Sequence, residues 1–172
     1  MKHANGDVYI GQWSRSVAHG FGVFYRTDGT KYSGQFCNDL QDGWGVETFP
    51  NGASYAGTFL SGKKSGFGVY TWPDGSKFEG QWSHDTISGV GAYKGLGGRR
   101  YQGRWLNSRM HGIGLFRWPD GLEYEGQFVA DEEKGFGLYR EPNGGMAQWG
   151  HWPAPEGQNV LLGTAPAPAA PA

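Results

Sequence analysis

The sequence predicts an all-β protein, an elongated, twisted single antiparallel sheet built from consecutive β-hairpins. An aromatic residue recurs every 23 residues, and a glycine and a second aromatic residue follow each one at fixed distances. Glycine accounts for 32 of the 172 residues, and aromatic residues for 16% of them. This aromatic content excludes a disordered glycine-rich linker, and the absence of a Gly-X-Y triplet period excludes collagen. No stretch of the array shows the 3.6-residue apolar period of a helix.

The first strand of each unit has the pattern aromatic-x-Gly-x-aromatic. Alternate residues of a strand share a face, so both rings and the glycine lie on one side and mostly polar residues on the other. The ring positions are Tyr9, Trp13, Tyr32, Phe36, Tyr55, Phe59, Phe78, Trp82, Tyr101, Trp105, Tyr124 and Phe128. We expect a ring to lie flat over the bare backbone of a neighbouring strand. Burial of the ring would then offset the cost of about 0.5–1 kcal/mol for each interior glycine.

A Gly-x-Gly motif opens the second strand of each unit, as in the segments from Gly20 to Phe24 and from Gly66 to Tyr70. An Asn-Gly or Asp-Gly pair turns the chain into most of the following units. The units start near residues 5, 28, 51, 74, 97 and 120, so residues 1–145 form a repeat array. Residues 146–162 are expected to form a degenerate terminal unit or cap, and residues 163–172 an extended Ala/Pro-rich tail.

A single sheet of this kind has no second layer to cover its ring-bearing face. Soluble monomers rarely expose apolar patches larger than a few hundred Å². We therefore expect this face to bind a partner protein, with self-association as a second way of covering it. The candidate partner-binding residues are the twelve rings together with Trp149 and Trp152. In the alternative interpretation, the rings bury one another completely.

Charge and motif content argue against several functions. The net charge of −1 and the mixed charge pattern disfavour a nucleic-acid groove, which needs a basic stripe. The segment 57–63 resembles a phosphate-binding loop, but it lies inside the hairpin pattern without a following helix. His19 and His111 occupy equivalent positions roughly 40 Å apart and cannot share a metal ion. We therefore predict no enzymatic activity, no catalytic residues, no cofactor and no metal. The single cysteine, Cys37, fits a cytoplasmic setting.

Tyr-x-Gly-x-Trp, a spacer, His-Gly-x-Gly and Asp-Gly, at a 23-residue step, together resemble the MORN repeat. Residues 9–22, with His19, are one example, and the resemblance covers about residues 2–145. It implies a non-catalytic scaffold or adaptor that binds other proteins, in a ciliary axonemal assembly such as the radial spoke or in the cytoskeleton. The histidine is replaced in four units, by Asp42, Ser65, Ser88 and Lys134.

A peripheral membrane adaptor is the alternative function that the same resemblance leaves open. Such a protein would bind acidic phospholipids through loop residues and would need clustered basic side chains on one set of loops. Lys63 and Lys64 form one basic pair, but Asp39, Asp85 and the acidic run 131–133 also fall in loops. We therefore treat membrane lipid as the weaker of the two expected partners.

Overall fold

The computed structural model describes residues 4–142 and 147–152; the described residues up to 85 form one compact unit, and those from 86 onward form a second. The strands of the first unit are β1 (Val8–Ser14), β2 (Val17–Tyr25), β3 (Lys31–Cys37), β4 (Leu40–Thr48), β5 (Ser54–Leu60), β6 (Lys63–Thr71) and β7 (Lys77–Ser83). Those of the second unit are β8 (Thr86–Lys94), β9 (Arg100–Leu106), β10 (Arg109–Arg117), β11 (Glu123–Val129), β12 (Glu132–Arg140) and β13 (Ala147–Trp152). A short 3₁₀ turn, η1 (Leu96–Gly98), separates β8 from β9.

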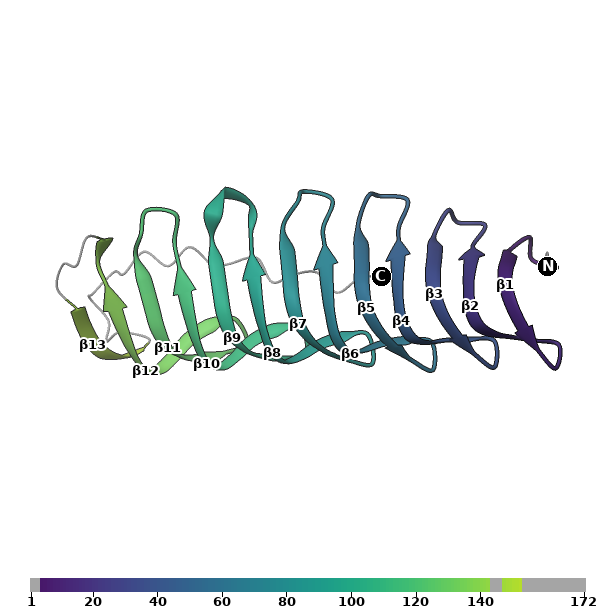
Figure 1. Cartoon of the computed structure of the whole chain (residues 1–172). Helices are drawn as coiled ribbons and strands as arrows, with labels where there is room; N and C mark the ends of the chain where they lie inside the picture. Colours follow the sequence, from purple (N-terminus) through teal and green to yellow (C-terminus); the bar gives the residue numbers. More distant parts are fainter. Residues whose placement is uncertain (1–3, 143–146, 153–172) are drawn as a thin grey trace. The chain divides into compact units, whose positions relative to one another are not determined.

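Within each unit every strand pairs antiparallel with the next strand in the sequence (Figure 1). The register places glycine opposite glycine: Gly11 faces Gly22, and Gly22 faces Gly34 on the next hairpin. This glycine row continues across the strands of each unit. The predicted all-β class, an open antiparallel sheet of consecutive hairpins, is confirmed. The predicted degenerate unit contains β13, which pairs with β12; residues 153–172, including the predicted tail, lie outside the described residues.

Two kinds of turn alternate along the chain. The turn inside each hairpin has two residues with positive φ, such as Asn38 (48°) and Asp39 (67°), and this geometry matches the right-handed twist of the strands. The turn between most hairpins uses the predicted Asp-Gly or Asn-Gly pair, and η1 takes its place before β9. In the turn between β2 and β3 the Asp28 carboxylate accepts a hydrogen bond from the Thr30 amide, at 2.7 Å. Both kinds of turn therefore fall at the positions that the sequence pattern predicts.

A β-bulge interrupts the pairing inside the hairpins. In the first hairpin Gly11 pairs with Gly22 and Trp13 with Ala18, so one residue on β1 faces three on β2. The bulge contains the first glycine of the Gly-x-Gly motif, Gly20, which has a positive φ of 85°. A bulge bends the strand pair, and Figure 1 shows the hairpins curving at the end that carries the two-residue turn.

The bent hairpin ends stack on one another. The Asp39 amide donates to the Ala18 carbonyl at 3.0 Å, and the Asp39 carboxylate accepts from the Ala18 amide at 2.7 Å. Lys64 and Asp85 form the same pair of bonds, as do Met110 and Asp131 in the second unit. The hairpin ends therefore form a second layer over the ring-bearing face, and the sequence pattern does not predict this layer.

Candidate partner-binding surface

The first ring of each unit lies against the glycine row, as the sequence predicts. A Cβ atom added to Gly22 would lie only 2.5 Å from the Tyr9 ring, so the ring occupies the space of the missing side chain. The Tyr9 hydroxyl donates to the Gln12 carbonyl at 2.8 Å, and Tyr32 makes the same bond to Gln35 at 2.9 Å. Burial raises the pKa of the Tyr32 phenol. The hydroxyl therefore stays protonated and available as a donor.

The rings of successive repeats form a chain of edge-to-face contacts. The Tyr32 ring centroid lies 5.1 Å from that of Phe36 in its own repeat and 5.0 Å from that of Phe59 in the next. Tyr55 contacts Phe59 and Trp82 in the same way, each at 5.1 Å. Edge-to-face pairs add stabilisation to that of burial. Four of the first rings, those of Tyr9, Tyr32, Tyr55 and Tyr101, are thus each held between two second rings, and the resulting aromatic layer is a core.

The expectation that this face leaves its rings exposed is wrong for eleven of the candidate partner-binding residues. The buried residues are Tyr9, Tyr32, Phe36, Tyr55, Phe59, Phe78, Trp82, Tyr101, Trp105, Tyr124 and Phe128, each at most 6% exposed. The alternative interpretation, in which the rings bury one another, describes them correctly. The physical reason is the bulge, which bends each hairpin end over the rings. A partner could contact these rings only if the aromatic layer opened.

The other three candidates differ from these eleven. Trp13 is 41% exposed and lies on β1, which has a neighbouring strand on one side only among the described residues. The backbones of Trp149 and Trp152 pair with Leu138 and Gly135 of β12. The side chains of these two tryptophans lie outside the described part of the structure.

The exposed apolar side chains gather instead on the opposite face of the strands. The middle residue of each Gly-x-Gly motif points away from the aromatic layer, because the second glycine, its neighbour on the strand, faces that layer: a Cβ atom at Gly22 would meet the Tyr9 ring, and one at Gly45 the Tyr32 ring. In the first unit these residues are Phe21 (61% exposed), Trp44 (54%) and Phe67 (56%), which we call the outer row. The equivalent residues of the second unit are Val90, Ile113 and Phe136, also exposed. Their 23-residue recurrence is a signal in the sequence, but only the pairing register shows which face they occupy.

A glutamine side chain supports the outer row at the bulge. The Gln12 side-chain oxygen accepts a hydrogen bond from the Phe21 amide at 2.7 Å, and Gln35 accepts from the Trp44 amide at 2.6 Å. These amides fall where the bulge breaks the regular ladder. Glutamine recurs at this position in the sequence as Gln12, Gln35, Gln81 and Gln127. The side chain therefore supplies an acceptor that the neighbouring strand does not.

The two units differ in the charge around these exposed side chains. On β3 and β5, the outward positions beside the outer row are Ser33, Gln35, Ala56 and Thr58, none of them charged. The equivalent positions on β9 and β11 are Gln102, Arg104, Glu125 and Gln127. An Arg140–Glu125 ion pair at 2.8 Å adds to the charge of this face in the second unit. On β7, Glu79 is the one charged residue at these positions in the first unit, diagonal to Phe67. The outer row is therefore apolar, with neutral neighbours around Phe21 and Trp44 and one carboxylate beside Phe67.

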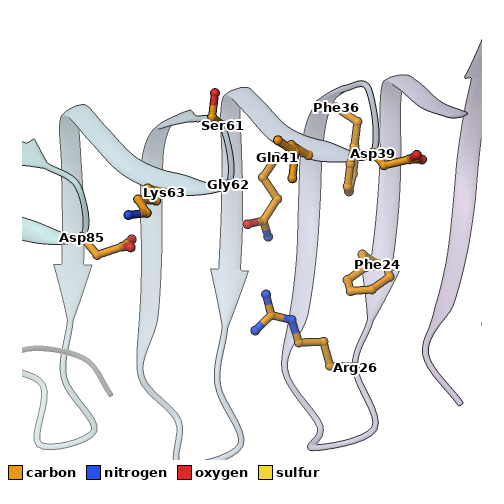
Figure 2. A pocket seen from close by; sticks show the side chains of 10 residues that line it. Phe24, Arg26, Phe36, Asp39, Gln41, Ser61, Gly62, Lys63 and Asp85 are labelled. Carbon is orange, nitrogen blue, oxygen red and sulfur yellow. The ribbon is translucent and has the colours of Figure 1, made fainter. Parts of the chain in front are cut away.

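A hollow of about 400 Å³ lies on the ring-bearing side of the first unit. Figure 2 shows Arg26 and Gln41 pointing toward a common space near Phe24 and Phe36. Asp39, Lys63 and Asp85 also line it. Arg26 stands where other repeats place a ring, such as Phe49 or Trp72. The hollow thus marks a repeat in which the aromatic filling is incomplete, and its walls carry both signs of charge.

Two polar pairs lie within the aromatic layer. Lys64 Nζ lies 2.8 Å from Glu47 Oε2 in the first unit, and the Tyr139 hydroxyl donates to Glu133 in the second. Burial raises the pKa of Glu133 to about 7. Within residues 4–142 and 147–152, no three His, Cys, Asp or Glu side chains form a group that could hold a metal ion.

Comparison with known proteins gives one specific result. A family model described as MORN repeat matches residues 9–31, 32–54, 55–77, 78–95, 101–123 and 124–146, well over half of the chain. The fourth match ends at residue 95, where η1 replaces the Asp-Gly turn. No curated protein matches the sequence. The described residues include no helix with the length and hydropathy of a membrane span.

Several solved structures are similar at low identity. The TCP10c domain of Drosophila melanogaster Sas-4 is 9% identical, with 87% of this chain and 88% of that chain covered and a TM-score of 0.48. The Drosophila SAS-4 TCP domain in complex with a proline-rich motif of Ana2 is 13% identical, with 88% and 93% covered and a TM-score of 0.48. The TCP10 domain of Danio rerio CPAP with a STIL peptide is 18% identical, with 85% and 74% covered and a TM-score of 0.30. These TM-scores are too low to carry over a function.

Proposed function

The chain belongs to the MORN-repeat family, and from this premise we propose that it is a non-catalytic scaffold or adaptor that binds a partner protein through its outer row. The observation that carries the proposal is the exposure of Phe21, Trp44 and Phe67 in one strip across β2, β4 and β6. Large exposed aromatic side chains on a rigid element are favourable contact residues, because they bury much area and lose little conformational entropy. The aromatic layer then serves to hold the strip rigid.

The position of the proposed surface differs from the one expected from the sequence. The ring-bearing face is occupied by the chain's own hairpin ends, so a partner there would compete with intramolecular packing. The outer row needs no such rearrangement. The proposal therefore keeps the expected function, protein binding, and moves the contact to the middle residues of the Gly-x-Gly motifs.

The cellular setting forms part of the proposal. We place the protein in a cytoplasmic assembly of the ciliary axoneme, such as the radial spoke, or of the cytoskeleton. Support for this placement comes from the family resemblance alone. Tagged protein expressed in ciliated cells would be expected to co-localise with axonemal or cytoskeletal markers, and a diffuse distribution would contradict it.

Affinity purification from cells, followed by mass spectrometry, tests the proposed surface. We expect partners recovered with the wild-type chain to be lost with a Phe21→Ser, Trp44→Ser, Phe67→Ser variant. The matched control is Ile113→Ser, which changes an equally exposed side chain at the equivalent position of the second unit. Unchanged recovery with a folded outer-row variant would overturn the proposal.

Flotation with phosphoinositide vesicles tests the membrane alternative in parallel. The hairpin turns carry Asp39, Asp85 and Asp131, whose carboxylates are held near the surface by the hydrogen bonds that stack the hairpin ends. Carboxylates repel acidic headgroups. We expect no salt-sensitive flotation at physiological ionic strength.

A further inference from the structure

We propose that the outer row (Phe21, Trp44 and Phe67) binds an uncharged, proline-rich segment of a partner protein in the polyproline II conformation. This inference rests on the proposed function, because it names the chemistry of the partner that the outer row would bind. Three properties of the row support it: its spacing, its place inside the sheet and its charge.

The spacing of the row matches a polyproline II helix. Phe21, Trp44 and Phe67 lie on β2, β4 and β6, two strands apart, which corresponds to about 9.4–9.8 Å between neighbours. A polyproline II helix has three residues per turn and rises about 3.1 Å per residue, so one of its faces repeats about every 9.3 Å. Each turn of such a ligand would therefore meet one ring, and nine residues would cover the whole row.

Other regular conformations fit the row less well. One face of a β-strand repeats about every 6.6–6.8 Å. Two turns of an α-helix advance about 10.8 Å, so a straight helix along the row would be out of step by more than about 1 Å at each repeat. Polyproline II is the regular conformation that remains in phase across all three rings.

The backbone under the centre of the outer row lies inside the sheet and not at its edge. Trp44 lies on β4, which pairs with β3 on one side and β5 on the other, and Gln35 accepts from the Trp44 amide. A ligand strand therefore cannot extend the sheet at this place. A polyproline II segment has no internal hydrogen bonds and keeps its backbone solvated, and exposed aromatic side chains are its usual contacts. The outer row thus supplies the exposed aromatic side chains that a polyproline II segment contacts.

Charge complementarity selects an uncharged ligand. Ser33, Gln35, Ala56 and Thr58 flank Phe21 and Trp44 with neutral side chains, and Glu79, diagonal to Phe67, is the one charge at the flanking positions. An uncharged segment loses little on desolvation against such a strip, whereas a charged one would lose its hydration without gaining a counter-charge. In the second unit Arg104 and Glu125 stand at two of the equivalent positions, so the same ligand would have to desolvate charges there.

The test is titration calorimetry of the full chain with a 12-residue peptide of four Pro-Ala-Ala units. We expect saturable binding that Trp44→Ala weakens about tenfold or more, while Trp44→Phe keeps it within a few-fold. Ile113→Ala, in the second unit, is the matched control and should leave binding unchanged. A peptide with proline at every fourth position should bind clearly more weakly than the three-residue repeat, because its prolines fall out of phase with the rings.

Each contrary outcome has a distinct meaning. Absence of peptide binding, or equal binding to wild type and to a folded Trp44→Ala variant, overturns the proposed chemistry. Self-association of the full chain that Trp44→Ala abolishes, measured by sedimentation, would make a second copy the occupant and overturn it as well. If the peptide fails but the Phe21, Trp44, Phe67 variant still loses its cellular partners, the proposed function stands and only the polyproline chemistry falls.

Discussion

Lys64 Nζ lies 2.8 Å from Glu47 Oε2 within the aromatic layer of the first unit, with both side chains less than 10% exposed. The two residues come from neighbouring repeats and stand where other repeats place apolar residues, such as Ala18 for Lys64 and Tyr70 for Glu47. The Lys64 ammonium also lies 5.2 Å from the Phe49 ring and 5.5 Å from the Tyr55 ring. The pair therefore replaces a ring contact by an ion pair.

Removing one partner of this pair should destabilise the chain strongly. Lys64→Met leaves Glu47 as an uncompensated buried charge, for which a loss of about 3–5 kcal/mol in the free energy of unfolding is expected. The double change Glu47→Tyr, Lys64→Ile gives the pair the side chains of the equivalent positions in other repeats and should recover most of that loss. Urea denaturation measures both. A single variant as stable as wild type would show that the pair is not buried in solution.

This pair also shows where sequence reasoning reaches its limit. The 23-residue period was enough to predict the hairpins, the turns and the contact between Tyr9 and the glycine row. It did not predict the bend at Gly20, because the pairing register decides which residues a bulge displaces. Without the bend, the ring-bearing face looks uncovered, and the outer row of Phe21 and Trp44 looks like the continuation of an ordinary strand. The sequence pattern predicts a loop at Lys64, but the bend brings this residue into the core.

Gly45 should not tolerate a side chain, because the Tyr32 ring occupies its place. A Cβ atom at Gly45 would overlap the Tyr32 ring, and Gly45→Ala should cost about 2–3 kcal/mol of unfolding free energy. Gly52→Ala is the control: it has a positive φ of 90° but nothing within 4 Å of its Cβ position, so only backbone strain of about 1–2 kcal/mol applies.

A double-mutant cycle separates overlap from strain. In a Tyr32→Leu background the shorter side chain relieves the overlap, so Gly45→Ala should cost at least about 1 kcal/mol less than in wild type. Gly52→Ala should cost the same in both backgrounds. Equal costs of Gly45→Ala in the two backgrounds, measured by urea denaturation, would show that the ring does not cover this glycine.

The Gln35 side chain should contribute to stability through the bulge. Its amide oxygen accepts from the Trp44 amide at 2.6 Å, so Gln35→Ala should cost about 0.5–1.5 kcal/mol by removing that acceptor. Gln35→Glu keeps an acceptor of the same length and should lose less. Hydrogen exchange at the Trp44 amide gives a local readout, with faster exchange expected in Gln35→Ala alone. Equal protection in all three proteins would exclude the bond.

The second unit should become more stable as the pH falls from 8 to 5. Burial raises the pKa of Glu133 to about 7 in the folded chain, whereas its ordinary value is 4.5. The folded chain therefore binds a proton more tightly than the unfolded chain. This contribution is fully present below about pH 4.5 and is lost as the pH rises through 7. Allowing for partial exposure and solvent screening, we expect a change of about 1–2 kcal/mol.

The variant Glu133→Gln isolates this effect from all other titrating groups. Glutamine resembles the protonated acid and still offers an oxygen to the Tyr139 hydroxyl, which donates to Glu133 in the wild-type chain. The difference in unfolding free energy between variant and wild type should be small at pH 5 and should favour the variant at pH 8. Glu132→Gln, an exposed neighbour on the same strand, is the control and should show no such crossover. A difference that stays constant from pH 5 to pH 8 would show that Glu133 titrates normally, and hence that the hairpin end does not bury it.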